Sequence, residues 1–123
     1  MTDTLGASVH ASAVKVGHRA VLIRGASGTG KSRLAFDLIL AGRAGQIPPA
    51  VLVGDDRVHL RASQGQLTVH PARELAGLIE IRGLGIRRCD FVEDDIVGLV
   101  VDLAAPDAER MPPPAIGNRD RGR

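Results

Sequence analysis

Aromatic residues are almost absent from this 123-residue sequence, which has no tryptophan, no tyrosine and only two phenylalanines. Modules that bind single-stranded nucleic acid by stacking bases on aromatic rings are therefore poor candidates. Since 44% of the residues are hydrophobic, the core has to be built from valine, leucine, isoleucine and alanine, which bury less area each. We expect one domain with a thin aliphatic core.

Cysteine and long apolar runs are also scarce. The single cysteine, Cys89, cannot form an internal disulfide, and neither a second thiol nor a histidine cluster accompanies it to make a zinc site. No apolar run approaches the roughly 20 residues needed to cross a bilayer, and the N-terminal residues lack the pattern of a signal peptide. We expect a soluble cytoplasmic protein without a membrane partner.

An excess of charge of either sign is missing as well. The 16 Lys and Arg residues against 14 Asp and Glu give a net charge of +2, and the last five residues account for it. The rest of the chain is neutral, so the high isoelectric point reflects a short basic tail. No nucleic-acid partner is expected.

Short strands punctuated by glycine and proline make up most of the predicted organisation. A glycine loop joins a hairpin over residues 13–24 to a helix from Ser32 to about Ala41. Apolar residues of this helix fall on one face, and Gly42 is expected to end it. Further strands are expected at 50–53, 78–81 and 95–103, the last one buried and interrupted by Gly98, and a second hairpin joins 58–61 to 67–70.

Residues 25–32 read GASGTGKS and match the phosphate-binding pattern G-x-x-x-x-G-K-S between a predicted strand and a predicted helix. Glycines let successive N–H groups turn toward one anion, and the helix N-terminus adds partial positive charge. Lys31 is expected to reach the terminal phosphates and the Ser32 hydroxyl to bind magnesium. The alternative is a glycine-rich turn without a ligand. The predicted nucleotide-binding residues are Gly25, Ala26, Ser27, Gly28, Thr29, Gly30, Lys31 and Ser32.

Two further features select among nucleotide-binding functions. Asp55 and Asp56 follow an apolar strand, where phosphate-binding-loop proteins commonly carry a carboxylate on the metal side. Both enter one site only if the strand ends or bulges there; otherwise they form a solvated acidic turn. Glu80 and Arg82 share one face of a short strand beside two glycines, which suggests the wall of a site or an exposed edge strand.

Four segments in this order resemble the HPr kinase/phosphorylase family: SVH at 8–10, the GASGTGKS loop, GDDRV at 54–58 and GLIEIRGLGI at 77–86. The last is close to that family's own signature. The resemblance implies an α/β fold with a P-loop nucleotide-binding core and a mixed β-sheet, like that of phosphoenolpyruvate carboxykinases but shortened at the C-terminus. Residues 1–110 would form the kinase catalytic domain, and 111–123 a disordered tail rich in proline and arginine.

The resemblance also implies an activity, namely ATP- and magnesium-dependent phosphorylation of a serine in an HPr-like phosphocarrier of the phosphotransferase system. A homo-oligomer is implied too, because family members are typically hexamers. Residue roles follow the matching positions. They are Lys31 for the phosphates, Ser32 and Glu80 for magnesium, Asp56 to take the serine proton, His10 beside that carboxylate, and Arg110 as an active-site arginine. Asp55 joins the predicted magnesium residues because of its position after the apolar strand.

Alternatives from other functional classes stay open at this point. The chain could be an ATP-binding regulator without catalysis, or a P-loop kinase of a small molecule. On the residues alone His10 is an ordinary surface histidine, and only the resemblance gives it a role. The family's loop for phosphorolysis lies beyond the position of Arg110, so the prediction covers the kinase direction and does not extend to the reverse reaction.

Overall fold

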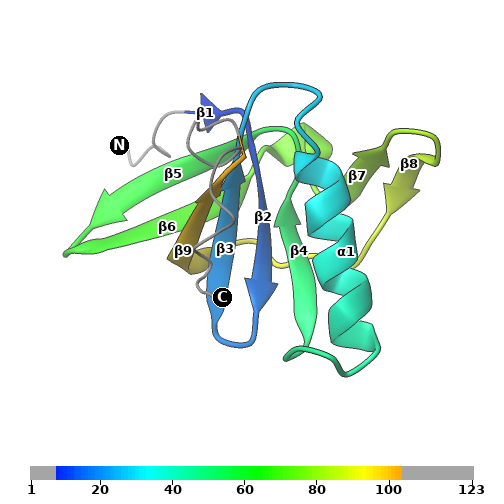
Figure 1. Ribbon diagram of the computed structural model, residues 1–123. Helices are drawn as coiled ribbons and strands as arrows, with labels where there is room; N and C mark the ends of the chain where they lie inside the picture. The colour runs from blue at the N-terminus through cyan, green and yellow to red at the C-terminus, as the bar shows by residue number, and fades with distance from the viewer. Residues whose placement is uncertain (1–7, 104–123) are drawn as a thin grey trace.

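The computed structural model of the chain describes residues 8–103, and most of them lie in short strands around one α-helix (Figure 1). The elements in chain order are β1 (Ser8–Val9), β2 (Ala11–Val16), β3 (Arg19–Arg24), α1 (Lys31–Arg43), β4 (Ala50–Gly54), β5 (Val58–Ser63), β6 (Gln66–Pro71), the 3₁₀ turn η1 (Arg73–Leu75), β7 (Leu78–Ile81), β8 (Gly85–Arg88) and β9 (Asp95–Asp102).

Seven strands form one curled, mixed sheet in the order β1-β5-β6-β9-β3-β2-β4. Strands β3 and β9 pair in parallel, and the other neighbours in the sheet pair antiparallel. Strands β7 and β8 form a separate hairpin, which Figure 1 shows beyond α1 and β4. The predicted mixed α/β class is confirmed, and the two predicted hairpins are present as β2–β3 and β5–β6.

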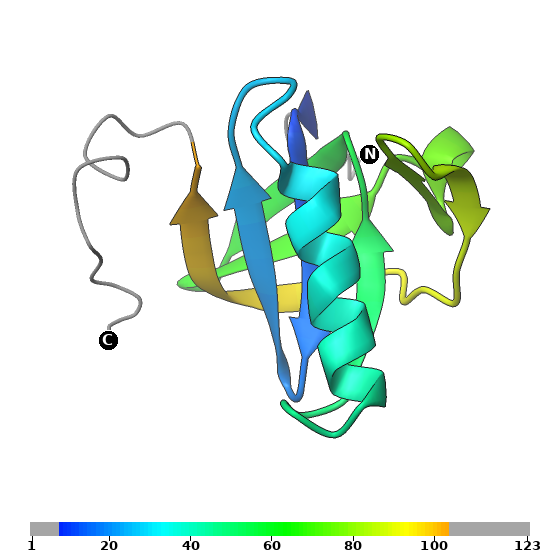
Figure 2. The ribbon, with the colours of Figure 1, turned by 45° about the vertical axis from the view of Figure 1, so that its right-hand side comes forward.

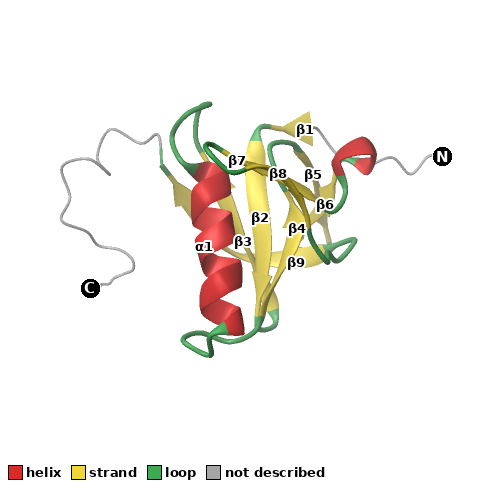
Figure 3. Ribbon diagram, turned by 90° about the vertical axis from the view of Figure 1, so that its right-hand side faces the viewer, coloured by secondary structure: helices red, strands yellow, loops and turns green. Residues whose placement is uncertain are grey.

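Both faces of β2, β3 and β4 are buried, because successive side chains of a strand point to opposite sides. Helix α1 and β7 cover one face, and the β5–β6 hairpin covers the other (Figures 2 and 3). The helix-side core consists of Val14, Ile23, Ala35, Ile39, Leu52, Ile79 and Ile81. The hairpin-side core consists of Ala11, Ala13, Ala20, Leu22, Val53, Val58 and Val69. Both cores are aliphatic, as predicted.

Helix α1 buries the face that the apolar spacing predicts, with Ala35 and Ile39 at its centre. The prediction that Gly42 ends the helix is wrong, because the helix continues to Arg43. A Cβ at Gly42 would lie 2.7 Å from the Ala50 backbone nitrogen. This glycine therefore lets the helix approach β4 closely and is not a stop signal.

Strand β9 differs from its prediction in burial. The expected buried strand at 95–103 is present, but Leu99 is 53% exposed and Val100 is 47% exposed. Within residues 8–103, β6 pairs only with the start of β9, at Asp95 and Ile96, so the second half is covered by a neighbour on one side. Gly98 does interrupt the strand, since the pairing with β3 shifts there.

Residues 1–7 and 104–123 lie outside the described part, and with them Arg110 and the predicted tail at 111–123. Strand β8 was not predicted, since the glycines on both sides of Leu84 indicated only a tight turn. Both glycines have positive φ, and they close the β7–β8 hairpin. Among the described residues, no helix has the length and apolar character needed to cross a membrane.

Candidate active site

The glycine loop connects the end of β3 to the start of α1. Gly28 and Gly30 have φ values of 86° and 96°, and a Cβ at either position would meet no atom within 4 Å. Glycine is therefore required there by backbone conformation, and the loop leaves open space beside it. The Ala26 carbonyl oxygen holds the loop together, because it accepts hydrogen bonds from the Thr29 N–H, the Thr29 hydroxyl and the Lys31 ammonium group.

Lys31 is the first residue of α1, and its side chain is buried against this loop. It is 8% exposed, and its Nζ lies 3.1 Å from the Ala26 oxygen. An ammonium group carries three N–H donors, and this hydrogen bond uses one of them. The arrangement holds a positive charge beside the N-terminus of a 13-residue helix, which adds its own partial positive charge.

A buried carboxylate lies next to the loop, at the end of β4. Asp55 is 3% exposed, and its Oδ1 accepts hydrogen bonds from the Ser12 hydroxyl at 2.6 Å and the Ser32 hydroxyl at 2.7 Å. The Ser32 hydroxyl also lies within hydrogen-bond distance of Oδ2, at 2.9 Å. Oδ2 accepts a further hydrogen bond from the Glu80 backbone N–H at 3.2 Å. We call Ser12, Ser32, Asp55 and the Glu80 amide the Asp55 corner.

The Asp55 corner joins four elements that are distant in the sequence. Its residues come from β2, α1, the end of β4 and β7. Burying a charge is costly unless hydrogen bonds replace its water, and three donors do so here. The structure thus brings the side chains of Ser32 and Asp55, two of the residues predicted for magnesium, together with the backbone of the third, Glu80. The Glu80 side chain itself is exposed, on the face of β7 opposite Ile79 and Ile81.

Asp56 has an unusual backbone. Its φ is 70°, and the Arg57 N–H donates to the Asp55 carbonyl oxygen at 2.7 Å, so Asp56 is the central residue of a γ-turn. This turn with positive φ is rare and strained in a residue other than glycine. It directs consecutive aspartates differently, because Asp55 is buried and Asp56 is exposed. The β2–β4 pairing also shifts just before this turn, beside Gly54.

Asp55 and Asp56 can both enter one site only if the strand ends or bulges at them, and the structure meets this condition. The strand ends and its register shifts at this point, so their side chains are not forced to alternate across a regular strand. Gly54 fits here because a Cβ would lie 2.7 Å from the Val58 Cγ1 atom.

The SVH segment lies beside this turn. Strand β1 pairs with β5 so that Val9 faces Val58, which lies two residues after Asp56. The Arg57 guanidinium also donates to the Ser8 hydroxyl at 2.9 Å. The His10 ring is exposed, and its role beside Asp56 stays a prediction.

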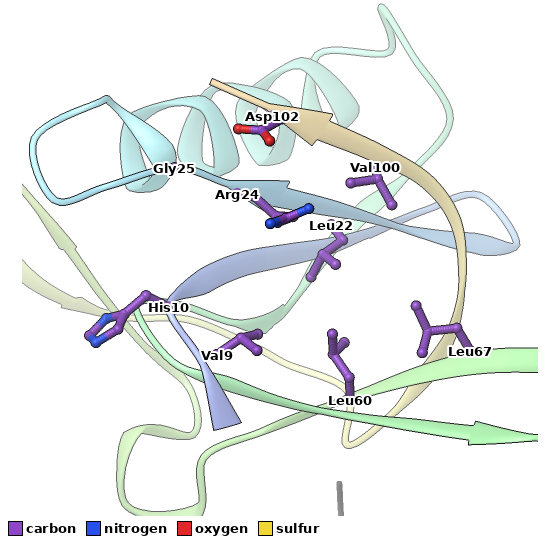
Figure 4. A pocket seen from close by; sticks show the side chains of 9 residues that line it. All are labelled: Val9, His10, Leu22, Arg24, Gly25, Leu60, Leu67, Val100 and Asp102. Atoms are coloured by element: carbon purple, nitrogen blue, oxygen red, sulfur yellow. The ribbon is translucent and has the colours of Figure 1, made fainter. Parts of the chain in front are cut away.

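A pocket of about 640 Å³ opens between this segment, the glycine loop and β9 (Figure 4). Apolar side chains from β3, β5, β6 and β9 point into it, while the His10 ring lies at the rim and points away from them. The lining residues are Val9, His10, Leu22, Arg24, Gly25, Leu60, Leu67, Val100 and Asp102.

Ser12 was not among the predicted site residues. The predicted first strand began at Ala13, so this serine fell outside it, whereas β2 begins at Ala11. A signal was present, since Ser12 is a lone small polar residue among the alternating apolar positions of the segment. The partner that makes this position important, Asp55, lies 43 residues further along the chain.

Comparison with known proteins identifies the family. Residues 4–101 match the family described as the HPr serine kinase C-terminal domain. The chain belongs to this family. The resemblance drawn from the SVH, glycine-loop, GDDRV and GLIEIRGLGI segments is thereby confirmed.

Two similar relatives are HPr kinase/phosphorylases. The protein of Streptococcus thermophilus is 44% identical over 80 residues, and that of Enterococcus faecalis is 46% identical over 81 residues. Each match covers 64% of this chain and 24% of the relative. The chain therefore spans about a quarter of the length of these two relatives.

A solved structure shares the fold. The HPr(Ser) kinase/phosphatase of Coxiella burnetii superimposes with a TM-score of 0.68 and 28% sequence identity. The match covers 92% of this chain and 66% of the solved one. The curled mixed sheet with its α-helix is thus the family's architecture.

Proposed function

We propose that this chain is a serine protein kinase, which transfers the γ-phosphoryl group of ATP to a serine of an HPr-like phosphocarrier. One observation carries the proposal, namely that the Ser32 hydroxyl donates to both oxygens of the buried Asp55. This contact joins the loop that would hold the phosphates to the carboxylates that would hold the metal. Family membership supports the choice of substrate, since the relatives named above are HPr kinases.

The glycine loop is the proposed phosphate site, a P-loop of the kind found in nucleotide-binding proteins. Its positive-φ glycines and the N-terminus of α1 present backbone N–H groups to an anion. The Lys31 ammonium group lies against the same loop and would bind the terminal phosphates.

The residues present fit a magnesium ion. Because the Ser32 hydroxyl donates its proton to Asp55, both lone pairs of its oxygen remain for a cation. Among residues 8–103, no group of three or more acidic, histidine or cysteine side chains could hold a metal by itself. Such a sparse set suits magnesium, which is usually bound by one or two carboxylates together with substrate phosphates. Ser32 and Glu80 would hold it, Asp55 would support it through the Ser32 hydroxyl, and the ion would neutralise charge on the transferred group.

Asp56 is the proposed proton acceptor. The serine oxygen of the carrier would form a bond to the γ-phosphorus as the bond to the β-phosphate oxygen breaks, and the hydroxyl proton would pass to the Asp56 carboxylate. The exposed side chain and the γ-turn suit this task, since they present the carboxylate to an incoming protein. His10 follows Val9, which pairs with Val58 close to this turn, and it would lie beside the Asp56 carboxylate. Arg110 lies outside the described residues, and its role as an active-site arginine stays a prediction.

The test is phosphorylation of a purified HPr-like protein by the chain with magnesium and ATP, followed by mass spectrometry. We expect one phosphate on a serine of the carrier. Asp56→Asn is expected to abolish the transfer while ATP binding survives, because this residue lies outside the loop. Asp37→Asn, on the exposed face of α1, is the matched control and should leave transfer unchanged.

Other outcomes separate the alternatives. Tight ATP binding without transfer would favour a regulator without catalysis. Phosphate on a histidine of the carrier, or only on a small molecule, would contradict the proposed serine kinase. Equal loss of ATP binding in Asp56→Asn would assign that residue a structural role.

A further inference from the structure

Ser12 is a polar residue in a place where apolar residues are expected. It is completely buried on β2, on the same face as Val14 of the helix-side core. A buried hydroxyl without a partner is costly, so its single contact matters. Its hydroxyl donates to the Asp55 Oδ1 at 2.6 Å, a length typical of a hydrogen bond to a charged oxygen.

We propose that Ser12 is a positioning residue that aims the Ser32 hydroxyl at the metal through Asp55. The proposal rests on the proposed function, because it concerns magnesium at the nucleotide site. Ser12 and Ser32 both donate to the Asp55 Oδ1, and in the bonds described above Ser12 is linked to Ser32 only through that carboxylate.

The geometry of the carboxylate carries the argument. Ser12 holds Oδ1 from β2, and the Glu80 amide holds Oδ2 from β7. With one donor besides Ser32 on each oxygen, rotation of the Asp55 carboxylate about its Cβ–Cγ bond would break a hydrogen bond. The carboxylate plane is therefore fixed.

The fixed plane in turn orients Ser32. Its one hydroxyl proton faces both carboxylate oxygens, at 2.7 and 2.9 Å, so the lone pairs of its oxygen point away from Asp55. Without Ser12, the carboxylate would be free to turn and pair with Ser32 through one oxygen only. The direction of the lone pairs would then vary, and a cation would find its ligand poorly aimed. Groups that orient metal ligands in this way typically contribute 10- to 100-fold in metal affinity.

A purely structural role for Ser12 makes a different prediction. If the hydroxyl only compensates the buried charge, its removal lowers the stability of the protein and leaves the response to magnesium unchanged. The two roles therefore differ in magnesium dependence, which is measurable without catalysis.

The experiment measures binding of an N-methylanthraniloyl derivative of ATP by fluorescence, in EDTA and across a magnesium titration, together with thermal unfolding. In Ser12→Ala we expect the magnesium concentration for half-maximal enhancement of binding to rise roughly tenfold, with binding in EDTA unchanged. Ser12→Thr and Ser12→Val form a matched pair, because they have the same shape and differ in the hydroxyl. Threonine should keep the magnesium midpoint near that of the wild type, and valine should raise it as alanine does.

The outcomes distinguish this inference from the proposed function. An unchanged magnesium midpoint in folded Ser12→Ala would overturn the positioning role while leaving the nucleotide site in place. Equal shifts in the threonine and valine variants would also overturn it, since the added methyl group would then be the cause. A wild-type protein that binds no nucleotide at all would refute the proposed function itself, and the inference with it.

Discussion

The Asp55 corner and the second half of β9 differ in which kind of side chain they bury. In the Asp55 corner a carboxylate that is 3% exposed lies among apolar strands, and every hydrogen bond to it comes from another element. In the second half of β9, Leu99 and Val100 are about half exposed although they belong to an apolar run. A polar group is buried in one region, and apolar groups are half exposed in the other.

The difference follows from the number of elements that pack around each region. The carboxylate is buried because four elements converge on it and supply the donors that replace water. The apolar end of β9 is exposed because, within residues 8–103, β3 alone pairs with it over Leu99–Val101. The hydrogen bonds of the Asp55 corner therefore come from β2, α1 and β7, and none of them comes from β9. Three predictions test this contrast.

The largest effect is expected from a matched pair of leucines on neighbouring strands. Leu22 is 2% exposed and Leu99 is 53% exposed. Leu22→Ala would leave a cavity in the hairpin-side core and should lower the free energy of unfolding by about 2–5 kcal/mol. Leu99→Ala should change it by no more than about 0.5 kcal/mol. Urea unfolding of both variants measures the difference, and similar losses would mean that Leu99 is covered in solution.

A smaller effect is expected from the two adjacent aspartates. Asp55→Asn replaces an accepting oxygen with an N–H₂ group that faces donors, and should cost about 1–3 kcal/mol of stability. Asp56→Asn should be close to neutral, because the side chain is exposed and asparagine tolerates positive φ. Thermal unfolding of the two variants checks the prediction. Equal destabilisation would contradict it, because the exposed γ-turn would then depend on its carboxylate as much as the buried corner does.

The smallest effect concerns Cys89, which packs against the helix-side core. Burial raises the pKa of its thiol, and the nearby Asp55 and Asp90 charges raise it further while Arg43 lowers it. Because the folded pKa is higher than the unfolded one, this residue's contribution to stability is present below the unfolded pKa. It is lost as the pH rises through the folded pKa.

Two measurements check this pKa shift. Alkylation by iodoacetamide at pH 8 should be slower in the native protein than in urea, and Asp55→Asn should speed it by removing a negative charge. The decline in melting temperature at alkaline pH should be shallower in Cys89→Ala. Alkylation as fast as in the unfolded chain would contradict a raised pKa.

Much of the fold could be predicted from local patterns. Apolar alternation around tight turns located the β2–β3 and β5–β6 hairpins, and the spacing of Ala35 and Ile39 located the buried face of α1. The errors arose where a residue's neighbours are distant in the chain. Gly42 was assigned to a helix end, although its role is close contact with Ala50. The burial of β9 was overestimated, since the residues themselves do not indicate how many strands pair with it.

The candidate site divides in the same way. The order of glycines before Lys31 and Ser32, and the pair of aspartates after a strand, are properties of the sequence, and they were enough to suggest the family that comparison confirms. Which aspartate is buried, and that Ser12 holds it, depended on the convergence of β2, α1, β4 and β7. The physical reason is range. Backbone conformation and periodicity act over a few neighbouring residues, whereas the partners of a buried charge are chosen only when distant segments pack together.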